Sequence, residues 1–228
     1  MPLKIIGTSH IARESIQEAK RAIIEEKPDI IALELDPQRA AALLSKEQRK
    51  IPLKEALHVG FRGYLFAKIG QKIQQKLGKM VGIAPGAEMK MGLELARKHR
   101  LQVALIDQPI DVTLRNFSKN LTWKEKFRFV GDLLKGLFLP KRQLRRLGLE
   151  HFDLQKVPGK KMIATMMQQF KERYPSVYKT LVEDRNRYMV KKLVVLLRKY
   201  PEKNILALVG AGHEEGMKEL LLKVDVVR

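Results

Sequence analysis

The stretch Leu3-Lys4-Ile5-Ile6-Gly7-Thr8-Ser9-His10 and the stretch Ile30-Ile31-Ala32-Leu33-Glu34-Leu35-Asp36 decide the fold. Leu3–Ile6 and Ile30–Leu35 are short apolar runs, which predict two buried strands. Glu14–Glu26 predicts a helix between them, because its apolar residues recur three and four positions apart. A strand, a helix and a strand spaced this closely form a βαβ unit, so we expect the two strands to be parallel.

Polar side chains follow the ends of these strands. His10 comes just after the first strand, and Glu34 and Asp36 close the second. In open parallel sheets, ligands bind at the carboxyl ends of the strands. A second turn of the same kind, Gly210-Ala211-Gly212-His213, follows the apolar run Asn204–Val209. The sequence therefore predicts that two imidazoles from opposite ends of the chain meet beside carboxylates in one cleft.

The rest of the pattern predicts an α/β fold with a parallel or mixed central sheet, flanking helices and a helical insertion. Residues 1–228 are expected to form a single domain, with the basic insertion at about 117–160, where lysines and arginines alternate with aromatic residues. The further elements expected are helices over Pro37–Leu44, Leu53–Leu77, Glu88–Lys98, Lys161–Lys171, Ser176–Tyr200 and Glu214–Leu222, a buried strand over Gln102–Ile106 and a last edge strand over Val224–Val227.

Composition limits the partners and the chemistry. The 228 residues include 45 Lys and Arg against 25 Asp and Glu, a formal net charge of +20. Such a charge suits an anionic partner, and the surface of an anionic membrane fits it better here than nucleic acid, because no RNA-binding signature accompanies the basic segment. The chain has no cysteine, which excludes disulfides and thiolate metal sites. Met1-Pro2-Leu3-Lys4 leads directly into a strand rather than a secretory signal, so we expect a cytoplasmic location, with membrane association as the alternative.

Two histidines and a carboxylate at strand ends could hold a divalent transition metal. Imidazole and carboxylate together suit Mn, Zn, Co or Fe, and an open coordination position would activate a bound water. The metal ligands expected are His10, His213 and Glu34. Without a metal, His10 could act as a general base on water while a carboxylate orients it. In either reading Gly7 and Gly210 are expected to let the chain turn sharply past each strand.

Taken together, these residues resemble the TraB/PrgY family of pheromone-shutdown proteins. The resemblance covers nearly the whole chain and is specific through the order of its blocks rather than through any one of them. The blocks are Gly7-Thr8-Ser9-His10, Glu34-Leu35-Asp36 with Arg39, Pro85-Gly86-Ala87-Glu88, Asp107 with Val112-Thr113-Leu114-Arg115, Asp184-Arg185-Asn186-Arg187-Tyr188-Met189 and Val209-Gly210-Ala211-Gly212-His213.

The resemblance implies a wider superfamily of TIKI-type proteases, ChaN-like haem-uptake proteins and erythromycin esterases. TIKI members are proposed metalloproteases, whereas the esterases are thought to use histidine and glutamate without a metal. Carried over to this chain, the site residues are His10, Glu34, Glu88, Arg185 and His213. Their supports would be Asp36, Arg39, Arg115 and Asn186.

Three functions follow as expectations. The first is a hydrolase, metal-dependent or not, that cleaves a peptide signal or otherwise limits its activity, with Arg185 stabilising the oxyanion. The second is a non-catalytic domain that binds and sequesters a peptide. The third is a basic scaffold on a membrane surface, and a homo-oligomer is compatible with each. Many family members continue into membrane-spanning helices, whereas this sequence ends at Arg228.

Overall fold

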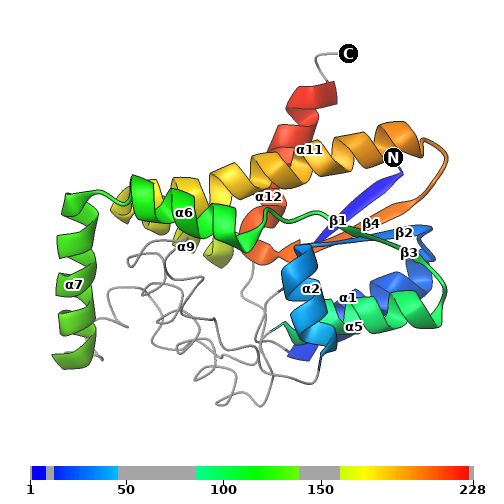
Figure 1. The fold of residues 1–228 in the computed structure, drawn as a ribbon, viewed down its shortest axis with the longest axis horizontal. Coiled ribbons are helices and arrows are strands. Elements are labelled where there is room, and N and C mark those ends of the chain that lie inside the picture. The colour runs from blue at the N-terminus through cyan, green and yellow to red at the C-terminus, as the bar shows by residue number, and fades with distance from the viewer. Residues whose placement is uncertain (1, 9–12, 46–85, 139–159, 226–228) are drawn as a thin grey trace.

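A four-stranded parallel sheet forms the centre of the molecule (Figure 1). The computed structural model describes residues 2–8, 13–45, 86–138 and 160–225. The strand order is β1–β4–β2–β3, and every neighbouring pair is parallel. The first and second strands are thus parallel, as the βαβ pattern predicts, but β4 lies between them. The strands are β1 (Leu3–Thr8), β2 (Ile30–Leu33), β3 (Gln102–Leu105) and β4 (Ile205–Gly210).

Helices cover both faces of this sheet, as Figure 1 shows. An αβα arrangement of this kind is expected where crossovers join parallel strands, and it confirms the α/β class. The helices are α1 (Arg13–Glu26), α2 (Pro37–Leu44), α5 (Ala87–Lys98), α6 (Ile110–Asn120), α7 (Trp123–Phe138), α9 (Lys160–Arg173), α10 (Pro175–Tyr178), a π-helical turn η1 (Lys179–Glu183), α11 (Asp184–Lys199) and α12 (Ala211–Asp225).

The core divides into two layers because successive side chains of a strand point to opposite faces. On one face, Leu206 and Leu208 of β4 pack in a buried cluster with Met89 and Ala96 of α5, which also includes residues of α1. On the other face, Ile205, Ala207 and Val209 pack with residues of α11 and α12. All six residues of β4 are buried, which is typical of a central parallel strand.

Several element boundaries differ from the sequence-based expectation. β1 continues to Thr8, so Gly7 and Thr8 are strand residues rather than part of a turn. The expected edge strand over Val224–Val227 is wrong for Val224 and Asp225, which belong to α12. The helix expected over Ser176–Tyr200 begins at Pro175 and contains the π-helical turn before α11.

The basic insertion is only partly described. Residues 117–120 end α6, and α7 follows as a separate helix that projects from the rest of the molecule (Figure 1). Residues 139–159, and the helix expected over Leu53–Leu77, lie outside the described residues. In the part of the chain that is described, no helix combines the length and the apolar character that a bilayer crossing needs.

Candidate functional site

The order of the strands brings the two ends of the chain together at the carboxyl edge of the sheet. Thr8 at the end of β1 lies opposite Gly210 at the end of β4, and its hydroxyl donates to the Val209 carbonyl at 3.1 Å. On the other side of β4, Leu33 lies opposite Leu208. Glu34 follows Leu33 directly, and its Oε2 accepts the backbone N–H of Gly210 at 2.5 Å.

Arg185, near the start of α11, is the centre of the polar cluster at this edge. Its Nε and Nη2 donate to the two carboxylate oxygens of Asp107 at 2.9 and 2.7 Å, a bidentate pair. Nη2 also donates to Oε1 of Glu34. Nη1 donates to the Leu181 carbonyl at 3.3 Å and contacts Nε2 of His213 at 3.1 Å. All five N–H groups of this guanidinium therefore have acceptors within the protein.

The cluster is buried and ionic. The side chains of Glu34 and Asp107 are 3% and 2% exposed, and that of Arg185 is 15% exposed. Burial opposes the charge of Arg185, but the ion pairs with Glu34 and Asp107 outweigh that cost and raise its pKa above the ordinary value. Arg185 therefore stays charged between two carboxylates, and removing it would take away the cation that Glu34 pairs with, whereas Asp107 would keep Arg39.

His213 is held on both ring nitrogens. Its Nδ1 lies 2.6 Å from Oδ1 of Asn186. Since an amide oxygen can only accept and a guanidinium can only donate, Nδ1 carries the proton and Nε2 accepts from Arg185. In this tautomer the imidazole is neutral and its Nε2 lone pair is directed at the cluster. Nε2 also lies 3.4 Å from Oε1 of Glu34.

Close helix packing positions Asn186. A β-carbon added at Gly216 of α12 would lie 2.5 Å from Nδ2 of Asn186, so only glycine leaves room for the amide. The π-helical turn lies directly before α11, and its Leu181 carbonyl accepts from the Arg185 side chain. Turns of this kind occur frequently at functional sites. Sequence reasoning named Asn186 as a support but gave Gly216 no role.

Three expected supports have different surroundings. Arg39 of α2 donates to Oδ2 of Asp107 at 2.7 Å and is therefore part of the cluster. Asp36 caps the N-terminus of α2, accepting from the backbone N–H groups of Gln38 and Arg39 at 2.8 and 3.1 Å. Arg115 instead pairs with Asp111 along the exposed face of α6 at 2.7 Å.

Asp107 is the member of the cluster that the expected site lacked. It sits two residues past the end of β3, at the same edge as Glu34, and three of its interactions organise the site: with Arg185, with Arg39 and with the backbone N–H of Gln108 at 2.7 Å. A signal was available, because Asp107 follows its strand just as Asp36 follows the preceding strand in sequence.

Of the other expected site residues, Glu88 makes no hydrogen bond or ion pair with Arg185, and His10 is not among the described residues. Glu88 is fully buried in the first turn of α5, where a carboxylate is favourable to the helix dipole. His10 lies outside the described residues and follows Thr8 by two positions in sequence.

The glycine of the first Gly-x-x-His turn has a different role from the one expected. Neither Gly7 nor Gly210 has a positive φ; among the described glycines only Gly86 does. A β-carbon at Gly7 would overlap the Glu214 carboxylate and lie 3.0 Å from the Cα of Ala211. Gly7 thus permits close approach of α12. His213 likewise lies in the first turn of α12, not on a loop.

The described donors do not suit a metal ion as they are arranged. Nε2 of His213 accepts from Arg185, and both oxygens of Glu34 accept N–H groups. A divalent cation on these atoms would have to displace the guanidinium. Within the described ranges, no three His, Asp or Glu side chains are grouped as metal ligands. Coordination that includes His10 remains a prediction.

Comparison with known proteins gives the family. The sequence matches the TraB/PrgY/gumN family over residues 3–224. An uncharacterized protein of Methanocaldococcus jannaschii is 35% identical over 226 residues, which is 97% of this chain and 53% of that protein. The human TraB domain-containing protein is 23% identical, covering 94% of this chain and 61% of its own length. The chain thus spans between half and two thirds of these relatives.

Among solved structures, a mutant erythromycin esterase in its open conformation aligns with 92% of this chain and 60% of its own, with a TM-score of 0.35 and 12% identity. A likeness at that level supports no argument about the site. The family match is different, because it extends over almost every residue, including the blocks around Glu34, Arg185 and His213. This chain belongs to the TraB/PrgY/gumN family.

Proposed function

We propose that this chain is a hydrolase-like domain that acts on a peptide. The observation that supports the proposal is the neutral His213, fixed on both ring nitrogens within a buried ionic cluster at the carboxyl edge of a parallel sheet. That edge is where open parallel sheets bind ligands. Neutral imidazoles oriented by a second group are the usual acids and bases of enzymes.

The proposed chemistry is attack of water on a peptide carbonyl. His10, two positions beyond Thr8, would take a proton from water as the hydroxyl bonds to the carbonyl carbon, and would return that proton to the amine nitrogen as the C–N bond breaks. His213, whose Nε2 carries a lone pair, would be a second proton acceptor beside it. Arg185 Nη1 makes the longest hydrogen bonds of that side chain, 3.1 and 3.3 Å. A developing oxyanion could therefore replace one of these two weaker acceptors of Nη1, while Nε and Nη2 keep their carboxylates.

The first turn of α12 adds to this stabilisation. α12 begins at Ala211, directly after β4, so its first N–H groups have no intrahelical acceptor and carry partial positive charge. Glu34 already uses one backbone N–H at this point, that of Gly210. The end of the helix is thus suited to negative charge near His213.

A divalent metal held by His10, His213 and Glu34 is the alternative route to an activated water. It requires Arg185 to leave Nε2 of His213, so metal binding and the arginine contact compete. Metal analysis of the purified protein, with and without added Mn²⁺, Co²⁺ or Zn²⁺, separates the routes. Stoichiometric metal that is lost in His213→Ala would favour the metal route, and activity that persists in chelator would exclude it.

Hydrolysis can be tested by mass spectrometry of a pool of ten-residue peptides incubated with the protein. We expect His10→Ala and His213→Ala to lower the cleavage rate by about 10²–10⁴-fold, the usual contribution of acid–base groups. His99→Ala is the matched control, because His99 is an exposed residue at the end of α5. Gly216→Ala should lower the rate without changing any polar side chain of the cluster. Cleavage unaffected by His10→Ala and His213→Ala would refute the assignment.

A non-catalytic peptide-binding domain is the rival function. The complete internal satisfaction of Arg185 favours it, since a finished ion-pair network can serve structure alone. Peptides that bind tightly but leave the incubation uncleaved, with or without added metal, would favour this function over the first.

An anionic membrane surface is the partner that α7 suits. Trp123 and Phe127 are 64% and 73% exposed, one helical turn apart, with their ring centroids 6.2 Å apart. Lys126 Nζ lies 4.1 Å from the centroid of the Trp123 ring. Exposed aromatics beside lysines are typical of helices that lie in a membrane interface. Co-sedimentation with vesicles containing phosphatidylserine tests this, and we expect Trp123→Ala with Phe127→Ala to abolish binding.

A further inference from the structure

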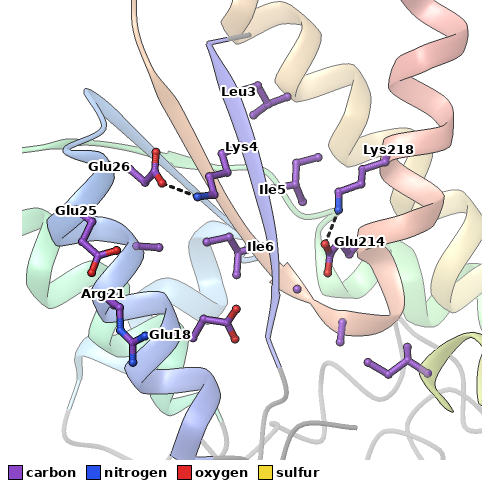
Figure 2. A pocket seen from close by; sticks show the side chains of 14 residues that line it. Leu3, Lys4, Ile5, Ile6, Glu18, Arg21, Glu25, Glu26, Glu214 and Lys218 are labelled. Atoms are coloured by element: carbon purple, nitrogen blue, oxygen red, sulfur yellow. Dashed lines mark hydrogen bonds and ion pairs between the residues drawn. The ribbon is translucent and has the colours of Figure 1, made fainter. Parts of the chain in front are cut away.

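A groove runs along the outer edge of β1. β1 is the end strand of the sheet, and its described strand neighbour, β4, lies on one side only. The groove has a volume of about 640 Å³, and the five consecutive residues Leu3–Gly7 line it (Figure 2). Since alternate side chains of a strand point to opposite faces, a cavity that touches five in succession follows the backbone edge.

Most of the wall of the groove comes from the two helices that flank β1 in Figure 2, and Ile163 of α9 adds to it. On one side is α1, where Glu26 pairs with Lys4 at 2.5 Å. On the other side is α12, where Glu214 accepts from Lys218 at 2.5 Å. The helices therefore leave a slot whose floor is the edge of β1 that pairs with no described strand.

We propose that this slot binds an extended peptide, which adds to the sheet beside β1 as a fifth strand. An edge strand presents N–H and C=O groups that a peptide can pair with, a recognised mode of peptide binding. Five residues at about 3.3 Å each give a floor about 16 Å long. The volume lies within the range of specific ligand sites, about 300–1,000 Å³.

The charge of the groove indicates which peptide it takes. In a chain of net charge +20, its lining has four carboxylates and three cations. Two of these carboxylates, Glu18 and Glu25 of α1, are exposed and have no ion pair with any described residue. They lie seven positions apart, on one face of the helix. The groove therefore favours a peptide with basic side chains towards α1 and small uncharged side chains towards α12, where Glu214 and Lys218 already pair with each other.

The groove also leads to the candidate site. Gly7, Ala211 and Glu214 line it close to Thr8, where β1 ends, and to His213 in the first turn of α12. A peptide paired with β1 would thus extend towards the cluster. This inference rests on the proposed function for the fate of the peptide, but binding itself does not depend on cleavage.

The test uses a fluorescein-labelled octapeptide of alternating lysine and valine, with binding followed by fluorescence anisotropy. Two versions of the peptide carry N-methyl groups on the backbone, one on every valine and one on every lysine. Since N–H groups of alternate residues point to the same edge of a strand, we expect one methylated version to lose binding and the other to keep it. General electrostatics cannot explain binding, because the peptide and the protein are both cationic.

The protein variant is Glu18→Lys with Glu25→Lys, and the matched control is Glu202→Lys, an exposed carboxylate in the turn after α11. We expect about a tenfold or greater loss of affinity in the first and no change in the second. Equal binding of all three peptides, or no effect of the double reversal, would overturn the inference. The inference would also be overturned if sedimentation showed a dimer that the same double reversal abolishes and the octapeptide did not bind.

Cleavage is read separately. Binding of the octapeptide to His213→Ala with unchanged affinity supports the groove whatever the enzymology shows. If the octapeptide binds to the groove but the unaltered protein does not cleave it, the proposed hydrolysis is refuted and the proposed peptide binding is supported. Cleavage at an unchanged rate in the Glu18→Lys, Glu25→Lys variant would support the proposed hydrolysis and contradict the role of the groove.

Discussion

Replacing Arg185 by methionine should destabilise the protein far more than the same change two residues later. Methionine keeps the length and packing of the side chain but removes the positive charge and all five hydrogen bonds of Arg185. Arg187→Met is the matched control on the same helix. Among the described residues Arg187 pairs only with Asp184, at 3.3 Å, and its side chain is 61% exposed.

The magnitude follows from what each change leaves behind. Without Arg185, Glu34 keeps the Gly210 N–H, and Asp107 keeps Arg39 and one backbone N–H. The nearest cation to Glu34 is gone, and breaking a buried pair in this way costs about 3–5 kcal/mol. The exposed pair of Arg187 is worth less than about 1 kcal/mol.

Urea denaturation followed by circular dichroism at 222 nm measures both free energies of unfolding. With a urea slope of about 2–3 kcal/mol/M for a chain of this size, Arg185→Met should lower the midpoint by about 1–2 M. The deficit should grow as pH rises from about 4 to 7, because the stranded carboxylate costs free energy only when it is ionised. Equal shifts for the two variants, or a deficit independent of pH, would refute the role of Arg185 as a buried counter-ion.

Two further predictions concern packing and a buried carboxylate. Gly7→Ala should lower the free energy of unfolding by about 1–3 kcal/mol, because the new β-carbon overlaps the Glu214 carboxylate and approaches the backbone of Ala211. Gly131→Ala is the control and should raise it by up to about 1 kcal/mol, because a β-carbon there meets nothing within 4 Å. Thermal unfolding of both variants checks this, and an unchanged stability of Gly7→Ala would contradict the close approach of α12. Burial alone would raise the pKa of Glu125, but hydrogen bonds from Ser176 and Thr122 outweigh it and lower the pKa. The stability that Glu125 contributes is therefore present above its unfolded pKa and is lost as pH falls through the lowered folded pKa. The difference in free energy of unfolding between the unaltered protein and Glu125→Gln should therefore shrink on acidification. A difference that stays constant from pH 7 to pH 3 would contradict this.

The sequence indicated the elements and the edge at which the chemistry would lie. Apolar runs located all four strands to within two residues at each end, because burial in a parallel sheet demands continuous apolar residues. Glu34, Asp107 and the second Gly-x-x-His turn come at or directly after the ends of these apolar runs, so the sequence alone placed them at strand ends. The start of the helix at Pro37 was predicted correctly, since proline suits the first helical position.

Only the tertiary structure decided which of these ends meet. Nothing local states that β4 inserts between β1 and β2, although that order places Gly210 beside both Thr8 and Glu34. Arg185 reaches Glu34 across 151 positions of sequence, and a helix pattern cannot distinguish such a buried arginine from a solvated one. Gly7 and Gly216 read as turn or helix residues until α12 packs against β1 and Asn186. Periodicity reports the burial of each segment separately, whereas pairing between distant segments depends on contacts that form only when the whole sheet is assembled.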